Sequence, residues 1–342
     1  MDLQITWFFL WALLWAIFFM TDGYDFGIGT LLPFMGRTET EKKVMINSMG
    51  PLWDGNEVWL ITAGGVTFAA FPILYATMFS SFYAAMLLIL FALIFRGVAF
   101  EFRHHMEDEG WRGFWDLCIF VGSVAPAVLF GVAFANIFQG IPLDQNGAYH
   151  GNLFSLLSGY GLLGGIFFLV LFMEHGAIWL ALKAPGDLEK RADLLANGLW
   201  WLSLAVALLF LIATKFKTQL YANYYANPVL FLLILLNLGL FIQTKIFLIR
   251  KSYFTAWLSS ALTILCCMFF GFIGLFPKVL PSSIDPAYSL TAFNSSSSPL
   301  TLKIMLTVVL IFIPIVLAYQ VWTYYLFKDK ISEADLEMEE AY

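Results

Sequence analysis

Long apolar runs separated by short polar segments dominate the chain. An α-helix needs roughly 20 apolar residues to cross the hydrocarbon core of a bilayer. The pattern predicts nine membrane-spanning helices, at about 6–34, 51–71, 75–101, 114–138, 157–182, 196–215, 228–249, 254–276 and 301–327. The second and third are expected to meet in a tight turn at Phe71-Pro72. Two connecting segments, 139–156 and 277–300, are longer than the rest.

Composition supports an integral membrane protein. The 342 residues are 61% apolar and 12% charged, with a mean hydropathy of +0.80, whereas soluble domains are about 25% charged. The polar segments are too short to bury a core of their own. We therefore expect an all-α fold in which residues 1–342 form a single polytopic membrane domain surrounded by lipid. Residues 328–342 read as an acidic tail, and we expect no nucleic acid as a partner.

The distribution of basic residues predicts the orientation of the helices. Cytoplasmic loops of membrane proteins carry an excess of Lys and Arg. With the N-terminus outside, 14 of the 18 Lys and Arg residues fall in inner loops, in the tail or near inner helix ends. This bias favours an external N-terminus, a cytoplasmic C-terminus and hence an odd number of spans.

Two carboxylates interrupt the first apolar run. Asp22 and Asp25 lie inside the run from Ile5 to Phe34, where insertion scales give a cost of roughly 2.5 to 3.5 kcal/mol for an ionised side chain. Their spacing of three residues places them on one side of a helix. Such groups normally face a bundle interior or a water-filled path. Helix–helix hydrogen bonding, including at a subunit interface, is the structural alternative.

More charged residues are expected near the inner ends of the second and third helices. Asp54 and Glu57 follow Pro51, so they either complement the helix dipole or form an acidic mouth. Arg96 and Glu101 lie near the inner end of the third helix. Arg96 could pair with Asp54, Glu57 or Glu101, as a structural ion pair or as part of a proton relay.

Histidines are scarce within the apolar runs. His175, beside Glu174, is the single histidine that the pattern places inside a membrane helix. A haem with two histidine ligands needs two that face each other. We therefore interpret His175 as a helix-contact residue, and the role of Glu174 is left open. No Cys/His metal spacing or nucleotide-binding motif is present in a suitable context.

Three motifs in the first third of the chain are family-specific. They are Thr-Asp-Gly-Tyr-Asp-Phe-Gly at 21–27, Trp-Asp-Gly-Asn-Glu-Val-Trp-Leu at 53–60 and Phe-Arg-Gly-Val-Ala-Phe-Glu-Phe-Arg at 95–103. With later segments, including Phe276-Pro277 and Pro281-Ser-Ser283, they closely resemble subunit II of bacterial cytochrome bd quinol oxidases. The resemblance runs in order along nearly the whole chain.

The resemblance implies a fold, a partner and cofactors. The fold is two four-helix bundles plus one peripheral helix. The partner is a haem-bearing subunit I, which forms a heterodimer with this chain and holds two b-type haems and one d-type haem, and a small third subunit is a further candidate. The complex oxidises quinol and reduces dioxygen to water at the bacterial cell membrane. It draws its protons from the cytoplasm, and this chain alone is expected to be inactive.

The resemblance also implies roles for individual residues. Asp25, Asp54 and Glu101 match carboxylates proposed to line proton routes toward the haems. Arg96, Glu57 and Asp22 would supply a supporting ion pair or the mouth of the route.

Two other functions fit buried carboxylates, namely a proton-coupled secondary transporter and a purely structural partner subunit. A transporter would more often show inverted repeats and broken helices, and the sequence shows neither.

Overall fold

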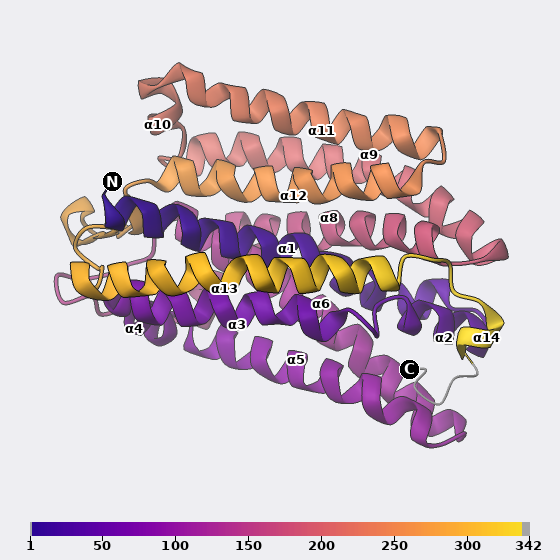
Figure 1. Cartoon of the computed structure of the whole chain (residues 1–342). Helices are drawn as coiled ribbons and strands as arrows, with labels where there is room; N and C mark the ends of the chain where they lie inside the picture. Colours follow the sequence, from indigo (N-terminus) through magenta and orange to yellow (C-terminus); the bar gives the residue numbers. More distant parts are fainter. Residues whose placement is uncertain (1, 337–342) are drawn as a thin grey trace.

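The computed structural model describes residues 2–336, and it is an array of long, roughly parallel helices (Figure 1). The helices long and apolar enough to span a membrane are α1 (Leu3–Met35), α5 (Tyr83–Phe102), α6 (Glu109–Gln139), α8 (Gly159–Lys183), α9 (Gly186–Lys217), α11 (Phe231–Ile249), α12 (Tyr253–Leu275) and α13 (Pro299–Leu326). The bent pair α3 (Trp53–Ala70) and α4 (Pro72–Ser81) makes a ninth candidate span when the two helices are counted together. The all-α membrane fold of about nine spans is confirmed, whereas its division into two four-helix bundles stays a prediction.

The expected turn at Phe71-Pro72 is a sharp bend. The axes of α3 and α4 differ by 120° there, and Phe71 leaves the helical region with φ −133° and ψ 64°. Pro72 has no backbone N–H to continue α3, and its fixed φ suits the first turn of a new helix. The expected third span, 75–101, is divided by Phe82 between α4 and α5.

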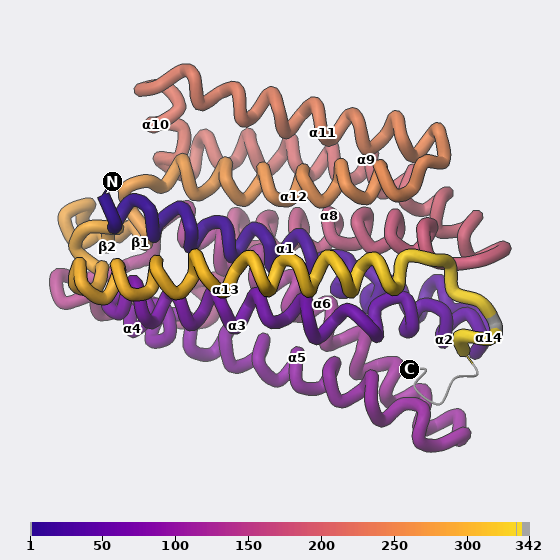
Figure 2. Tube along the Cα trace, in the orientation of Figure 1, coloured from indigo at the N-terminus to yellow at the C-terminus, as the bar shows by residue number. Residues whose placement is uncertain are grey.

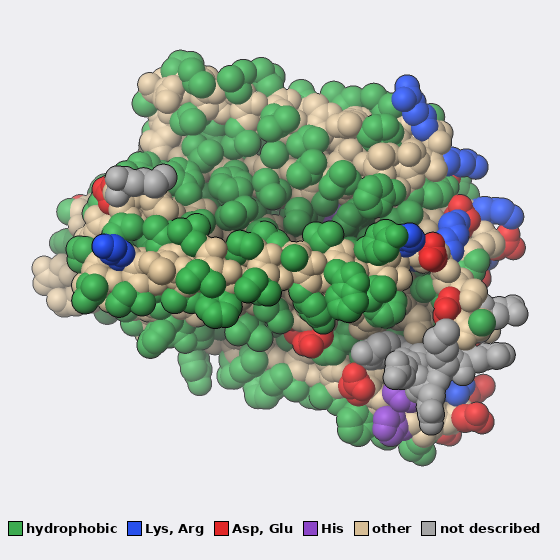
Figure 3. Space-filling view, in the orientation of Figure 1, with side chains coloured by type: hydrophobic (Ala, Val, Ile, Leu, Met, Phe, Trp, Pro, Cys, Tyr) green, Lys and Arg blue, Asp and Glu red, His purple; other side chains and the backbone are tan. Residues whose placement is uncertain are grey.

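Short elements complete both ends of the array. They are α2 (Glu39–Asn47), η1 (Arg103–His105), α7 (Leu153–Leu156), α10 (Tyr221–Ala226), η2 (Pro228–Leu230), η3 (Pro286–Tyr288), α14 (Glu333–Leu336) and the strands β1 (Lys278–Leu280) and β2 (Leu290–Thr291). The two strands pair antiparallel near the start of α1 (Figure 2). The two long loops join there, because the Ile141 amide donates to Pro281 and the Ser283 amide donates to Ile141. Lys and Arg side chains gather mainly at the opposite end, near α2 and α14 (Figure 3).

Helix α1 is the centre of the array. It packs against α3, α6, α8 and α12, and from Thr21 to Leu32 every residue is buried. Glycines let neighbouring helices approach it closely. A Cβ atom at Gly27 would lie 2.0 Å from the Phe172 carbonyl oxygen, and one at Gly176 would lie 2.7 Å from the Ile28 nitrogen. The α1–α8 contact is therefore a direct backbone contact.

Helix α13 contrasts with α1, because it lies along the outside of the array beside α1 and α3 (Figure 1). Leu302 is its single buried residue among those described. This exposed position agrees with the expectation of one peripheral helix.

The α1–α8 contact yields a prediction. Gly27→Ala should prevent normal packing of the two helices, because the new methyl group would meet backbone atoms that cannot rotate away. We expect a large loss of folded protein, measured as the monodisperse fraction after extraction in mild detergent. Gly239→Ala on α11 is the matched control, since a Cβ atom there has no neighbour within 4 Å. Equal yields of the two variants would contradict the proposed close contact.

Candidate functional site

Three charged side chains, two of them fully buried, meet where α1, α3 and α5 come together. The Arg96 guanidinium donates from one nitrogen to both carboxylate oxygens of Asp22, at 2.9 and 3.0 Å. The same nitrogen donates to Oε1 of Glu57. The side chains of Asp22 and Arg96 are fully buried, and that of Glu57 is 19% exposed. Because solvent does not reach this ion pair, its two charges are stabilised by each other and by their hydrogen bonds.

The packing of α6 leaves room for this arginine. A Cβ atom at Gly122 would lie 2.7 Å from Cβ of Arg96, so α5 and α6 approach closely at this level because position 122 lacks a side chain. The guanidinium carbon of Arg96 also lies 4.3 Å from the centre of the Phe26 ring. Nε and the second terminal nitrogen of Arg96 have no hydrogen-bond partner among the described residues.

Asp25 lies one helical turn from Asp22 and is also fully buried. Its Oδ2 accepts a hydrogen bond of 2.7 Å from Nδ2 of Asn56 on α3. Its Oδ1 has no hydrogen-bond partner within the described part of the chain. Asp22 and Asp25 lie one turn apart on α1, and the Arg96 guanidinium is close enough to interact electrostatically with both. The site thus combines three carboxylates with one arginine.

The structure brings together only some of the residues singled out in the sequence. Asp22, Asp25, Glu57 and Arg96 share one cluster, but Asp54 and Glu101 lie exposed on the outward faces of α3 and α5. Arg96 pairs with Asp22 and Glu57 rather than with Asp54 or Glu101. The reason is geometric, since Arg96 points toward α1 whereas Glu101 lies five residues further along α5.

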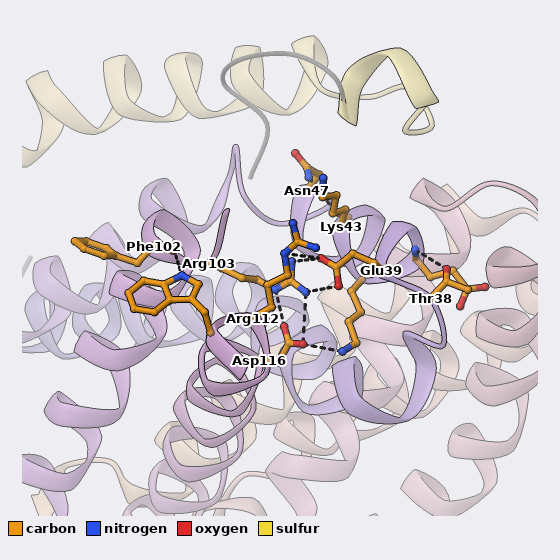
Figure 4. A network of polar contacts seen from close by, with 11 residues as sticks. Thr38, Glu39, Lys43, Asn47, Phe102, Arg103, Arg112 and Asp116 are labelled. Carbon is orange, nitrogen blue, oxygen red and sulfur yellow. Dashed lines mark hydrogen bonds and ion pairs between the residues drawn. The ribbon is translucent and has the colours of Figure 1, made fainter. Parts of the chain in front are cut away.

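A second charged network lies at the end of the array beside α2 and was not expected from the sequence. Arg103 donates to Asp116 at 2.6 Å and to Glu39 at 2.8 Å, and Lys42 donates to Asp116 at 2.8 Å. Figure 4 shows Arg112 close to Glu39 on the same side, with Nε 3.7 Å from Oε1. These contacts tie α2 to η1 and α6. The network therefore joins the segments that follow α1 and α5 to each other and to α6.

His175 and Glu174 face different neighbours of α8. Nδ1 of His175 lies 3.0 Å from the Ser260 hydroxyl, and Nε2 lies 3.1 Å from the Met20 carbonyl oxygen. Both ring nitrogens are thus used in helix contacts. The Glu174 carboxylate is 1% exposed and is faced by Ser203 and Lys245. Neither of its oxygens makes a hydrogen bond within 3.5 Å to a described residue.

Comparisons with known proteins agree with the motifs. The family model for cytochrome bd terminal oxidase subunit II matches residues 3–327. The chain is 35% identical over 334 residues to cytochrome bd ubiquinol oxidase subunit 2 of Bacillus subtilis, covering 98% of each chain. It is 36% identical over 369 residues to cytochrome bd-I ubiquinol oxidase subunit 2 of Escherichia coli, covering 98% of this chain and 97% of that protein. The chain belongs to the cytochrome bd terminal oxidase subunit II family.

A comparison with solved structures supports the fold. A chain of the bd oxidase from Geobacillus thermodenitrificans superposes with a TM-score of 0.73, at 16% identity, covering 95% of this chain and 97% of that one. At this identity the likeness concerns the fold alone. The subunit II motifs at 21–27, 53–60 and 95–103 contribute Asp22, Asp25, Glu57 and Arg96 to the buried cluster. In this subunit II chain, the distinctive motifs therefore converge on one site.

The ion cluster yields a prediction about stability. Arg96→Gln should destabilise the protein by about 3 to 5 kcal/mol, because it leaves a buried carboxylate without its cation. The measurement is thermal unfolding of the detergent-solubilised protein, with Arg250→Gln at an exposed helix end as the control. Adding Asp22→Asn to Arg96→Gln should recover part of the loss, since the fully buried pair is then uncharged. A wild-type midpoint for Arg96→Gln alone would show that the pair is dispensable.

Proposed function

We propose that this chain is subunit II of a cytochrome bd-type terminal oxidase, in which it stabilises the haem-bearing subunit I and contributes a cytoplasmic proton-uptake route. The complex would couple quinol oxidation to the reduction of dioxygen to water. Family membership along nearly the whole chain supports the assignment. This chain alone would be inactive, because quinol and the haems would be bound by the partner.

The main support for the proposed proton route is the pair of carboxylates in the buried part of α1. A buried aspartate within a membrane helix is costly, and such groups usually mark ion or proton pathways. Asp25 combines full burial with one unpaired carboxylate oxygen. That combination suits a group that binds and releases a proton. We propose that Asp25 is a proton-carrying group on the way to the oxygen-reducing haem.

The exposed carboxylates suggest where subunit I binds. Asp54 and Glu101 lie on outward faces of α3 and α5 amid exposed apolar side chains such as Phe95 and Phe102. Figure 3 shows acidic side chains within the apolar surface on this side of the molecule. Charged side chains in a membrane helix normally face protein or water rather than lipid. We propose that the partner covers this face, so that Asp54 and Glu101 would line the entrance at the subunit boundary and partly exposed Glu57 would connect it to the cluster.

The proposed orientation places the end with α2 and α14 in the cytoplasm and the N-terminus outside. The concentration of Lys and Arg at that end supports it (Figure 3). Protons would then enter from the cytoplasm, and Asp54 and Glu101 would be the first groups of the route. A topology reporter fused after Lys330 should accordingly report a cytoplasmic position.

Substitution of Asp25 tests the route directly. Asp25→Asn nearly preserves the shape of the side chain but removes its ability to titrate. In the assembled complex we expect near-normal haem content, with quinol oxidase turnover and proton uptake reduced by at least tenfold. Asp25→Glu should recover part of both activities. The measurements are oxygen consumption and pH changes in proteoliposomes.

The outcomes separate the proposed roles. Unchanged turnover in Asp25→Asn, at normal haem content, would remove this residue from the route. Loss of haem together with activity would instead favour a purely structural role for the subunit. Loss of turnover at full haem content supports proton delivery.

We also propose that the two b-type haems and the d-type haem are held by subunit I. Support comes from His175, whose two ring nitrogens already face Ser260 and the Met20 carbonyl. The chain purified without its partner should lack a Soret band. A Soret band that disappears in His175→Ala would overturn this assignment.

A further inference from the structure

Helix α13 contributes polar side chains to the centre of the protein although it lies outside it. Most of its residues are exposed, yet near its inner end Gln320 accepts a hydrogen bond of 2.8 Å from Trp59 and donates to the Gly55 carbonyl. One turn further, the Tyr324 hydroxyl reaches Asn56 at 2.9 Å and Tyr24 at 2.9 Å. The peripheral helix therefore contacts the residue that holds Asp25.

These hydrogen bonds form a closed ring with one defined direction. Nδ2 of Asn56 donates to the Tyr24 oxygen at 2.8 Å, and Tyr324 donates to Oδ1 of Asn56. Since the Tyr324 proton is used for Asn56, the contact between the two tyrosines must be donated by Tyr24. The second proton on Nδ2 of Asn56 points to Oδ2 of Asp25. Every donor of the amide is thus used, and its oxygen has a donor.

The ring fixes which side of the amide faces Asp25. An N–H group beside a carboxylate stabilises the ionised form, whereas a carbonyl oxygen in its place would stabilise the protonated form. Without the Tyr324 hydroxyl, the buried amide oxygen would lose its donor, which is costly. Rotation of the amide by half a turn would then place that oxygen against Asp25, where a protonated carboxyl could donate to it.

We propose that Tyr324 is a positioning residue that, through the Asn56 amide, sets how readily Asp25 releases its proton. The inference rests on the proposed proton route, but it concerns the control of that route by a helix outside the core. Tyr324 acts through Asn56, since its hydroxyl hydrogen bonds with Asn56 and Tyr24 rather than with Asp25. The other titratable or charged groups that face Asp25 are Asp22, Tyr24 and Arg96.

The inner end of α13 is held in place by the adjoining segment. Nζ of Lys183 on α8 donates to the carbonyl oxygens of Phe327 and Asp329, and the Ile331 amide donates to the Lys183 carbonyl at 3.0 Å. Lys330 pairs with Glu189 on α9 at 2.6 Å. Position 324 is thereby tied to the inner ends of α8 and α9 as well as to α1 and α3.

The test compares Tyr324→Phe with Tyr319→Phe in the assembled oxidase. Tyr319 lies on the same helix but is 62% exposed. We expect Tyr324→Phe to keep its haem content and to lose about five- to tenfold in turnover, the size expected for one hydrogen bond to a polar or charged group. Tyr319→Phe should behave as wild type. Equal turnover of the two variants, together with an unchanged titration of Asp25, would overturn the proposal.

Infrared difference spectroscopy supplies a reading that does not depend on turnover. The carbonyl stretch of protonated Asp25 is identified by its disappearance in Asp25→Asn. In Tyr324→Phe this band should persist to higher pH than in wild type, because the rotated amide stabilises the protonated acid. An unchanged band would contradict the inference even if turnover falls. A shifted band with normal turnover would support the inference and refute the proton route instead.

A double substitution separates positioning from general packing. If Tyr324 acts through Asn56, then Tyr324→Phe should add little to the effect of Asn56→Ala, because the intermediary is already gone. Additive losses in the double variant would show that Tyr324 acts by another path. Haem content and thermal unfolding in each variant exclude simple loss of assembly as the cause.

Discussion

The ion pair between Arg96 and Asp22 is the constraint that shapes the centre of this protein. Neither charge can face lipid, so protein must surround both on every side. Helix α1 is accordingly enclosed by α3, α6, α8 and α12. Gly27 and Gly122 permit this enclosure by letting backbones or side chains approach where a methyl group would collide. The buried charges therefore depend on the small residues, which let the surrounding helices enclose them.

A single arginine near several carboxylates leaves negative charge that one cation does not neutralise. Arg96 binds Asp22 and Glu57, while Asp25 receives a neutral donor from Asn56. In a region of low dielectric constant, the surplus favours binding of a proton somewhere in the cluster. An imbalance of this kind suits a site through which protons pass better than a site that only holds helices together. The network of Arg103, Lys42, Asp116 and Glu39 beside α2, in which two cations face two carboxylates, is the structural counterpart.

The sequence predicts the membrane spans and the central position of Asp22 and Asp25 well, because long apolar runs and interrupting charges are local signals. It also places the bend at Phe71-Pro72, since proline acts locally. The partner of Arg96 could not be chosen among Asp54, Glu57 and Glu101, because rotation of a helix about its axis depends on tertiary packing. Asn56 carries no charge, so the sequence pattern did not indicate it as part of the site, unlike its acidic neighbours. Tyr324 lies in an ordinary apolar run, about 300 residues from Tyr24.

That separation along the chain has a consequence for biosynthesis. Membrane helices enter the bilayer in the order of their synthesis, and the hydrogen-bond ring needs residues from α1, α3 and α13. Until α13 has been inserted, the Asn56 amide oxygen lacks its hydroxyl donor, and Asp25 is held by an amide free to rotate. The site therefore reaches its final form only after α13 has entered the membrane, long after α1 and α3, so the surroundings of Asp25 are completed late in synthesis.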